Sequence, residues 1–147
     1  MIIALASDHA GFSLKENLLC ALKAGDHSVL DLGPFSTRSV DYPDFAGMLC
    51  RSILEGKAER GILVCNSGIG MSIAANRFRG IRAALCLFPR MAFYARQHND
   101  ANVLVLAGGY TGFFLASEIA GVFLSEEFQG GRHLKRIEKI DSEDAHQ

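Results

Sequence analysis

The segment Cys65-Asn66-Ser67-Gly68-Ile69-Gly70 places a thiol, a hydroxyl and two glycines at the end of an apolar run. Glycines let the backbone pass close to a ligand, and a helix that begins here directs its first N–H groups into the same space. Such a position favours the ionised form of a thiol, and a thiolate is a competent base or nucleophile. A tight turn with an inert cysteine is the other interpretation, and the segment alone leaves both open.

Polar side chains that could transfer protons stand at two other places. Asp8 and His9 follow the first apolar run and could handle protons or bind a hydroxyl, or Asp8 could cap the next helix while His9 lies on the surface. His98 and Asn99 belong to the segment 96–102, which holds more polar residues than a turn needs, although both could simply cap the preceding helix. Position alone does not decide between these interpretations.

A basic segment near the end of the chain reads Gly130-Gly131-Arg132-His133-Leu134-Lys135-Arg136. Arg132 and Arg136 are four residues apart and therefore share one face of a predicted helix. Two guanidinium groups on one face match a phosphate, although a solvated basic face is the usual alternative. In a chain of formal net charge −1, such a local cluster favours an anion as ligand.

Together these groups suit proton transfer beside a carbonyl of a phosphorylated substrate. A base removes the proton, fixed donors hold the oxygen of the resulting enediolate, and cations hold the phosphate. Cys65 is the candidate base, Ser67 is the candidate hydroxyl, and Arg132 with Arg136 is the candidate phosphate ligand.

The elements that must position these groups alternate along the chain. Apolar runs predict strands at 2–6, 28–32, 61–65, 81–87 and 102–107. Helical patterns cover 11–24, 43–56, 69–77, 90–98 and 111–124, and a last short helix is expected at 132–140. The alternation predicts an α/β fold, in which a parallel sheet has helices on both faces. Ligands of such sheets bind beyond the carboxyl ends of the strands, which singles out 7–11, 33–42, 65–70 and 107–109.

Length and composition limit the class of protein. With 147 residues, of which 49% are hydrophobic and 21% charged, the chain suits a single domain at 1–141 and a polar tail at 142–147. The net charge of −1 argues against a general surface for nucleic acid. Apolar runs stay below the ~18 residues of a membrane span, and the first residues lack the basic start of a secretory signal. We therefore expect a cytoplasmic protein that does not bind membranes.

The four cysteines, Cys20, Cys50, Cys65 and Cys86, are widely spaced and form no C-x-x-C pair. We therefore expect neither a disulfide framework nor a zinc site. Cys20, Cys50 and Cys86 stand among apolar residues and are predicted to lie in the core.

Five segments, in order along about 1–140, resemble the type B ribose-5-phosphate isomerase family, which also includes allose- and galactose-6-phosphate isomerases. They are Ser-Asp-His-Ala-Gly-Phe at 7–12, Val-Asp-Tyr-Pro-Asp at 40–44, Cys-Asn-Ser-Gly-Ile-Gly-Met-Ser-Ile-Ala-Ala-Asn at 65–76, Arg-Gln-His-Asn-Asp-Ala-Asn-Val-Leu at 96–104 and Gly-Gly-Arg-His-Leu-Lys-Arg at 130–136. The resemblance implies a Rossmann-like, three-layer α/β/α sandwich with a five-stranded parallel sheet and a C-terminal helix. It also implies a homodimer or homotetramer whose site mixes residues from two subunits.

The implied reaction is isomerisation of the aldose D-ribose 5-phosphate and the ketose D-ribulose 5-phosphate through a cis-enediolate, without metal or cofactor. By resemblance, Cys65 matches the family's base and Ser67 its assisting hydroxyl, while Asp8 and His98 match residues of sugar binding and ring opening. Further matches are the sugar contacts Tyr42 and Asn99, the phosphate-binding residues His9, Arg132 and Arg136, and the backbone of Ser67, Gly68 and Gly70 for the enediolate.

The sequence departs from the family's pattern at three places. Gly109 stands where an arginine usually helps to bind phosphate. Asn66, beside the base, stands where glycine is common, and it could alter the pocket or merely tolerate a left-handed backbone. We count it among the candidate substrate-binding residues. The segment 86–91 is bulkier and more apolar than expected and could reshape the pocket rim.

These departures keep other functions open. An isomerase of six-carbon sugar phosphates is the close alternative, and a sugar-phosphate binder without catalysis is another. A receiver domain shares the alternation of elements and an acid after the first strand. It also needs a lysine after the fifth strand, where this chain has Gly108 and Gly109.

Overall fold

The computed structural model describes residues 1–142, in which five parallel strands form one sheet in the order β2-β1-β3-β5-β4. The strands are β1 Ile2–Ser7, β2 Ser28–Asp31, β3 Arg60–Cys65, β4 Ala83–Leu85 and β5 Val103–Ala107. The helices are α1 Phe12–Ala24, α2 Tyr42–Leu54, α3 Ile69–Ala75, α4 Pro89–Asn99, α5 Phe113–Ser125 and α6 Leu134–Asp141, with a 3₁₀ turn, η1, at Gly131–His133.

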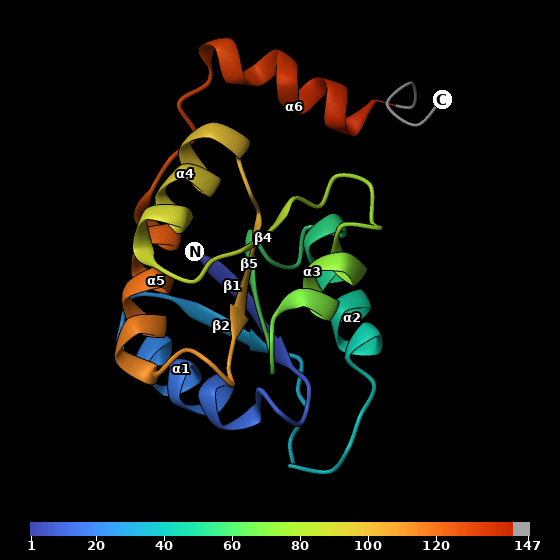
Figure 1. Ribbon diagram of the computed structural model, residues 1–147, viewed down its shortest axis with the longest axis vertical. Coiled ribbons are helices and arrows are strands. Elements are labelled where there is room, and N and C mark those ends of the chain that lie inside the picture. Colours follow the sequence, from blue (N-terminus) through green and yellow to red (C-terminus); the bar gives the residue numbers. More distant parts are fainter. Residues whose placement is uncertain (143–147) are drawn as a thin grey trace.

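Helices cover both faces of this sheet, which confirms the predicted three-layer α/β/α sandwich. Helices α1, α4 and α5 lie on one face and α2 and α3 on the other (Figure 1). Helix α6 lies apart from both layers, beyond the amino ends of the strands (Figure 1). None of the helices within residues 1–142 is long and apolar enough to cross a membrane.

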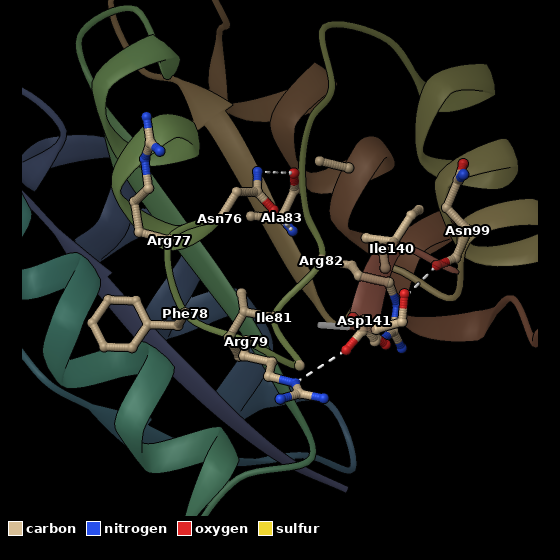
Figure 2. A pocket seen from close by; sticks show the side chains of 14 residues that line it. Asn76, Arg77, Phe78, Arg79, Ile81, Arg82, Ala83, Asn99, Ile140 and Asp141 are labelled. Carbon is tan, nitrogen blue, oxygen red and sulfur yellow. Dashed lines mark hydrogen bonds and ion pairs between the residues drawn. The ribbon is translucent and has the colours of Figure 1, made fainter. Parts of the chain in front are cut away.

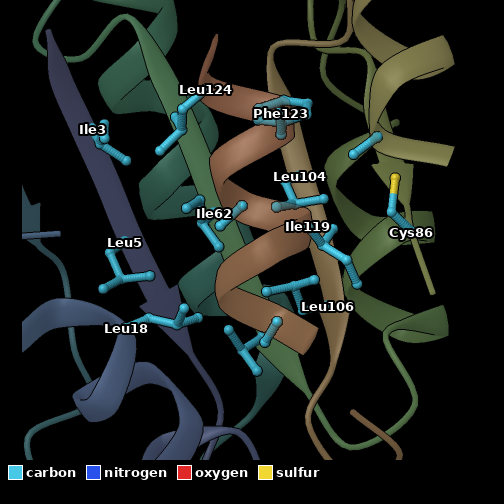
Figure 3. Close-up of a cluster of buried hydrophobic side chains, with 14 of the residues drawn as sticks. Ile3, Leu5, Leu18, Ile62, Cys86, Leu104, Leu106, Ile119, Phe123 and Leu124 are labelled. Carbon is cyan, nitrogen blue, oxygen red and sulfur yellow. The ribbon is translucent and has the colours of Figure 1, made fainter. Parts of the chain in front are cut away.

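The core has two apolar clusters, one on each face of the sheet. Alternate residues of β1 enter different clusters, because successive side chains of a strand point to opposite faces. Ile3 and Leu5 pack with α1 and α5, as Figure 3 shows, whereas Ala4 and Ala6 pack with α2 and α3. The central strands are thus buried on both sides, as expected for a parallel sheet.

The course of the chain creates a switch point between β1 and β3. From β1 the chain passes through α1 to β2, and it later returns to β3 on the other side of β1. Helices α1 and α3, which follow β1 and β3, therefore lie on opposite faces, on either side of the carboxyl ends of the two strands (Figure 1). Ligands of doubly wound sheets bind at such a point.

The fourth strand is shorter than predicted, Ala83–Leu85 rather than 81–87. Asparagine side chains bind the backbone at its start, beside the pairing with β5. The Asn76 carboxamide bonds both the N–H and the carbonyl of Ala83, at 2.8 and 2.9 Å, and Asn102 Oδ1 accepts the N–H of Arg82 at 2.9 Å. Such side-chain contacts leave no apolar pattern in the sequence.

The prediction for Cys20 was wrong. Cys20 lies on the outer face of α1 and is exposed, whereas Cys50 and Cys86 are buried as predicted. Burial raises the pKa of the Cys50 thiol to about 11 and that of Cys86 to about 12. The predicted polar tail lies outside the described residues, apart from Ser142.

Candidate active site

Cys65 ends β3 at the switch point, and its side chain is held by the turn that follows. The Gly68 N–H donates a hydrogen bond to Cys65 Sγ at 3.1 Å. The chain reverses to make this contact because Gly68 has φ +76°, in the left-handed region that glycine adopts without strain. The donor stabilises negative charge on the sulphur once the thiol has lost its proton.

The same turn carries further polar groups. Ser67 Oγ accepts the Ile69 N–H at 3.3 Å, which orients the hydroxyl at the start of α3. The N–H groups of Ser67 and Gly70 donate to no other atom of residues 1–142. Residues 65–70 therefore carry a thiol, a hydroxyl and two unoccupied backbone donors, the types of group that can hold an oxyanion.

Asp8 and His9 lie next to this turn, after β1. Asp8 is buried, and its Oδ1 accepts the Gly11 N–H at 2.9 Å. This bond closes the turn before α1, whose N-cap is Gly11 and has no side-chain cap, so Asp8 does not cap the helix itself. His9 is exposed, and its Nδ1 accepts the Val40 N–H at 3.2 Å. That bond fixes the ring so that Nε2 is the nitrogen able to donate to a ligand.

Tyr42, the first residue of α2, closes the same space from the side. A Cβ placed on Gly70 would lie 2.7–3.1 Å from three atoms of the Tyr42 ring. Residue 70 must therefore be glycine for the phenol to lie against the start of α3. Tyr42, Asp8, His9 and the turn at 65–70 thus form one group at the carboxyl edge of the sheet, which we call the carboxyl-edge group.

Asn66, the departure beside Cys65, contacts Gly109, the departure after β5. The backbone N–H of Gly109 donates to the Asn66 carbonyl at 2.9 Å, and a Cβ on Gly109 would overlap Asn66 Oδ1. Within the described residues Asp100 is the one non-glycine with positive φ, so Asn66 does not serve a left-handed backbone. Asn66 therefore differs from a glycine at this position through its side chain and not through its backbone conformation.

Four predicted site residues, His98, Asn99, Arg132 and Arg136, lie elsewhere and form what we call the amino-edge group. His98 and Asn99 end α4, a helix that returns to the amino end of β5. The His98 ring stacks on His133 with centroids 4.2 Å apart. Arg132 lies in η1 rather than in the predicted helix, Arg136 lies in α6, and both are exposed.

The two groups lie at opposite edges of the sheet. Gly61 pairs with Val103 near the amino edge, and Cys65 pairs with Ala107 at the carboxyl edge. The four residue steps between these pairs correspond to roughly 13 Å of strand. One chain therefore does not bring Cys65 together with the two arginines.

A hollow of about 680 Å³ lies at the amino edge, between the α3–β4 connection and α6 (Figure 2). Asn99 contributes to its lining. Arg82 pairs with Asp100 at 3.0 Å and with Asp141 at 2.8 Å, and Arg79 donates to the Asp141 carbonyl at 3.0 Å. These contacts attach the last turn of α6 to the edge of the sheet. Cys65 does not line this hollow.

Two residues near the site were not recognised from the sequence. Lys15 is fully buried, and its Nζ lies 2.9 Å from Asp31 Oδ1, which also accepts the Gly33 N–H at 3.0 Å. This pair anchors the loop that carries Val40 and Tyr42. The sequence signal for this buried pair was a lysine at a core position of the helical pattern of α1. His133 is buried against His98, and burial, followed by the charges of His98, Arg132 and Arg136, lowers its pKa.

A doubly wound parallel sheet, with a thiol, a hydroxyl and unoccupied amides at its switch point, defines an α/β enzyme with a small-molecule site. Among residues 1–142, no three His, Cys, Asp or Glu side chains are grouped as a metal site. Comparison with known proteins then gives the family: the chain belongs to the ribose/galactose isomerase family, whose model matches residues 3–140.

Known relatives cover nearly the whole chain. Ribose-5-phosphate isomerase B of Escherichia coli strain K12 is 41% identical over 138 residues, 94% of this chain and 93% of that protein. The crystal structure of a ribose 5-phosphate isomerase from Thermotoga maritima is 57% identical and covers 95% of this chain and 97% of its own, with a TM-score of 0.94. Ribose-5-phosphate isomerase B of Clostridium thermocellum is 45% identical over 96% of this chain and 95% of its own, with a TM-score of 0.95.

Proposed function

We propose that this chain is an aldose–ketose isomerase that interconverts D-ribose 5-phosphate and D-ribulose 5-phosphate, with Cys65 as the base. Membership of the ribose/galactose isomerase family and relatives named ribose-5-phosphate isomerase B support this function. The observation that carries the choice of base is the position of Cys65 Sγ, at the switch point and 3.1 Å from the Gly68 N–H.

The reaction begins on the open-chain aldose. The Cys65 thiolate removes the proton from C2, the electrons of that C–H bond form the C1–C2 double bond, and the carbonyl electrons move onto O1. The amides of Ser67 and Gly70 stabilise this negative oxygen in the cis-enediolate. Cys65 then returns the proton to C1, and the Ser67 hydroxyl assists transfer of the O2 proton to O1. The product carries its carbonyl at C2.

The remaining residues of the carboxyl-edge group bind and orient the sugar. Asp8 Oδ1 accepts the Gly11 N–H, and the other carboxylate oxygen, Oδ2, accepts a sugar hydroxyl during ring opening. The Tyr42 hydroxyl contacts the sugar chain from α2. His9 donates from Nε2 to the phosphate, because its Nδ1 is occupied by Val40.

We assign the amino-edge group to the site of a second copy of the chain, in a homodimer or a pair of dimers. His98 would act in ring opening, Asn99 would contact the sugar, and Arg132 with Arg136 would bind the phosphate. The separation of the two groups supports this assignment, since a five-carbon sugar phosphate does not span roughly 13 Å of strand. Each site would then combine the thiol of one protomer with the arginines of its partner.

A coupled assay with a panel of phosphorylated aldoses tests the reaction. We expect turnover of ribose 5-phosphate, with lower kcat/KM for allose 6-phosphate and galactose 6-phosphate. Preference for a six-carbon substrate would overturn the choice of sugar. We include six-carbon substrates because Gly109 stands in place of an arginine. Binding without turnover of any aldose would establish a non-catalytic binder instead.

Mixing two inactive variants tests the shared site. Cys65→Ala removes the base and Arg132→Ala removes a phosphate ligand. If each site uses both protomers, mixed dimers contain one intact site of two, and re-associated mixtures recover about a quarter of wild-type activity. Activity that stays at the mean of the two separate variants would overturn the shared site.

A further inference from the structure

We propose that Asn66 binds a hydroxyl of the sugar chain. Glycine at residue 109 leaves room for the Asn66 carboxamide in the position that this contact requires. This inference rests on the proposed isomerase function and assigns a specificity role within the same site. It concerns two of the three places at which the chain departs from the pattern that its motifs resemble.

The backbone fixes the two residues together. Beyond the last strand pair, the Gly108 N–H donates to the Cys65 carbonyl at 2.7 Å and the Gly109 N–H donates to the Asn66 carbonyl at 2.9 Å. These bonds continue the pairing of β3 and β5 past the ends of both strands. Asn66 is therefore as firmly placed as the candidate base that precedes it.

The side chain of Asn66 then covers Gly109. A Cβ on Gly109 would overlap Asn66 Oδ1 and would lie 3.0 Å from Asn66 Cγ. The backbone near this position is less crowded, since the Asn66 carbonyl oxygen would lie at 3.1 Å. A methyl group at residue 109 would thus displace the carboxamide while leaving the backbone nearly in place.

The carboxamide has no other structural task in the described part of the chain. Asn66 is exposed, its side chain makes no hydrogen bond within residues 1–142, and its φ is not positive. In the sequence it stands between Cys65 and Ser67, and its carboxamide lies beside Gly109. A neutral amide that both donates and accepts matches a sugar hydroxyl better than a phosphate, for which a cation is the usual partner.

Four variants test the pair. In Asn66→Ala and in Gly109→Ala the contact is lost, so each raises KM for ribose 5-phosphate about tenfold, the size expected for one hydrogen bond, with a smaller change in kcat. The double variant is no worse than either single variant, because both remove the same contact. Gly112→Ala is the matched control in the same β5–α5 connection, where a Cβ meets nothing within 4 Å, and it behaves as wild type.

Two ligands separate a hydroxyl contact from a phosphate contact and from structural damage. We expect calorimetry to show about tenfold weaker binding of ribitol 5-phosphate to Asn66→Ala and unchanged binding of inorganic phosphate. Equal losses for both ligands, no loss for either, or an additive loss of about a hundredfold in the double variant would each overturn the proposal. If Gly109→Ala fails to fold, the binding of the two ligands to Asn66→Ala still tests the proposal.

Failure of this inference is distinguishable from failure of the proposed function. Calorimetry needs no turnover, so the Asn66 contact is measured even in a protein that does not isomerise. Conversely, wild-type turnover that disappears in Cys65→Ala supports the isomerase even if Asn66→Ala binds both ligands normally.

Discussion

The Gly68 N–H lies 3.1 Å from Cys65 Sγ, and this hydrogen bond joins the end of β3 to the start of α3. The contact spans three residues and depends on the left-handed conformation of Gly68. It therefore links the folding of a tight turn to the chemistry of the thiol. The segment 65–70 forms the tight turn of one interpretation, and the reactive thiol of the other interpretation stays a prediction.

Replacing Cys65 should separate catalysis from binding. We expect Cys65→Ala to lower kcat by about 10²–10⁴-fold, the usual contribution of a general base, while sugar-phosphate binding persists. Cys86→Ala is the control, because burial raises the pKa of that thiol to about 12 and keeps it protonated near neutral pH. Steady-state kinetics and calorimetry check both variants. Full activity of Cys65→Ala would show that another group is the base.

Replacing Gly68 should damage the site more than the fold. Gly68→Ala gives a left-handed residue a side chain and places its Cβ against Leu85 Cδ1. We expect this variant to lose about 2 kcal/mol of unfolding free energy. Displacement of the N–H from Cys65 should lower kcat about 100-fold. Gly56→Ala is the control, with φ +71° but no atom within 4 Å of the new Cβ. It should lose about 1 kcal/mol and keep its activity. Urea unfolding and kinetics measure the two effects, and equal activities of the two variants would contradict the role of the turn.

The Lys15–Asp31 pair should anchor the loop before α2. Lys15→Met leaves the Asp31 carboxylate without its buried cation, and we expect a loss of about 3 kcal/mol of unfolding free energy. In Lys15→Met with Asp31→Asn, the charge is gone but an oxygen remains to accept the Gly33 N–H, so most of the loss should be recovered. Chemical unfolding of the three proteins checks this. A double variant as unstable as Lys15→Met would show that the packing of Lys15, rather than the charge of Asp31, dominates.

The His98–His133 stack should weaken in acid. Burial and the charges of His98, Arg132 and Arg136 lower the pKa of His133 below its usual 6.5. Between that lowered pKa and 6.5 the unfolded chain binds more protons than the folded chain, so the free energy of unfolding falls as the pH falls through this window. Unfolding of wild type and His133→Gln at successive pH values checks the sign. The variant should lose part of the pH dependence of the unfolding free energy. A His133 pKa at or above 6.5 in an NMR titration would contradict the prediction.

Much of the fold and half of the site could be predicted because they follow from local pattern. Helical spacing of Leu14, Leu18 and Leu22 and the continuous apolar runs identify α1 and the buried strands. The rule for carboxyl ends of parallel strands then collects Asp8 and Cys65 at one edge.

The rest depends on contacts between distant residues. Asn76 and Asn102 bind the backbone at the start of β4, and the buried position of Lys15 depends on Asp31 across the α1–β2 boundary. The division of the site into two groups follows from the direction of α4, which carries His98 back to the amino edge.

The contact of Asn66 with Gly109 also sets an order for mutation. A larger residue at 109 would overlap the Asn66 carboxamide, whereas loss of the carboxamide first would leave that space open. A chain with glycine at 66 and arginine at 109 can be reached by two orders of single substitutions. Changing residue 66 first avoids an intermediate in which Asn66 and a side chain at 109 overlap. Libraries that vary the specificity of this site should therefore randomise both positions at once, because separate scans of each would discard combinations that fit.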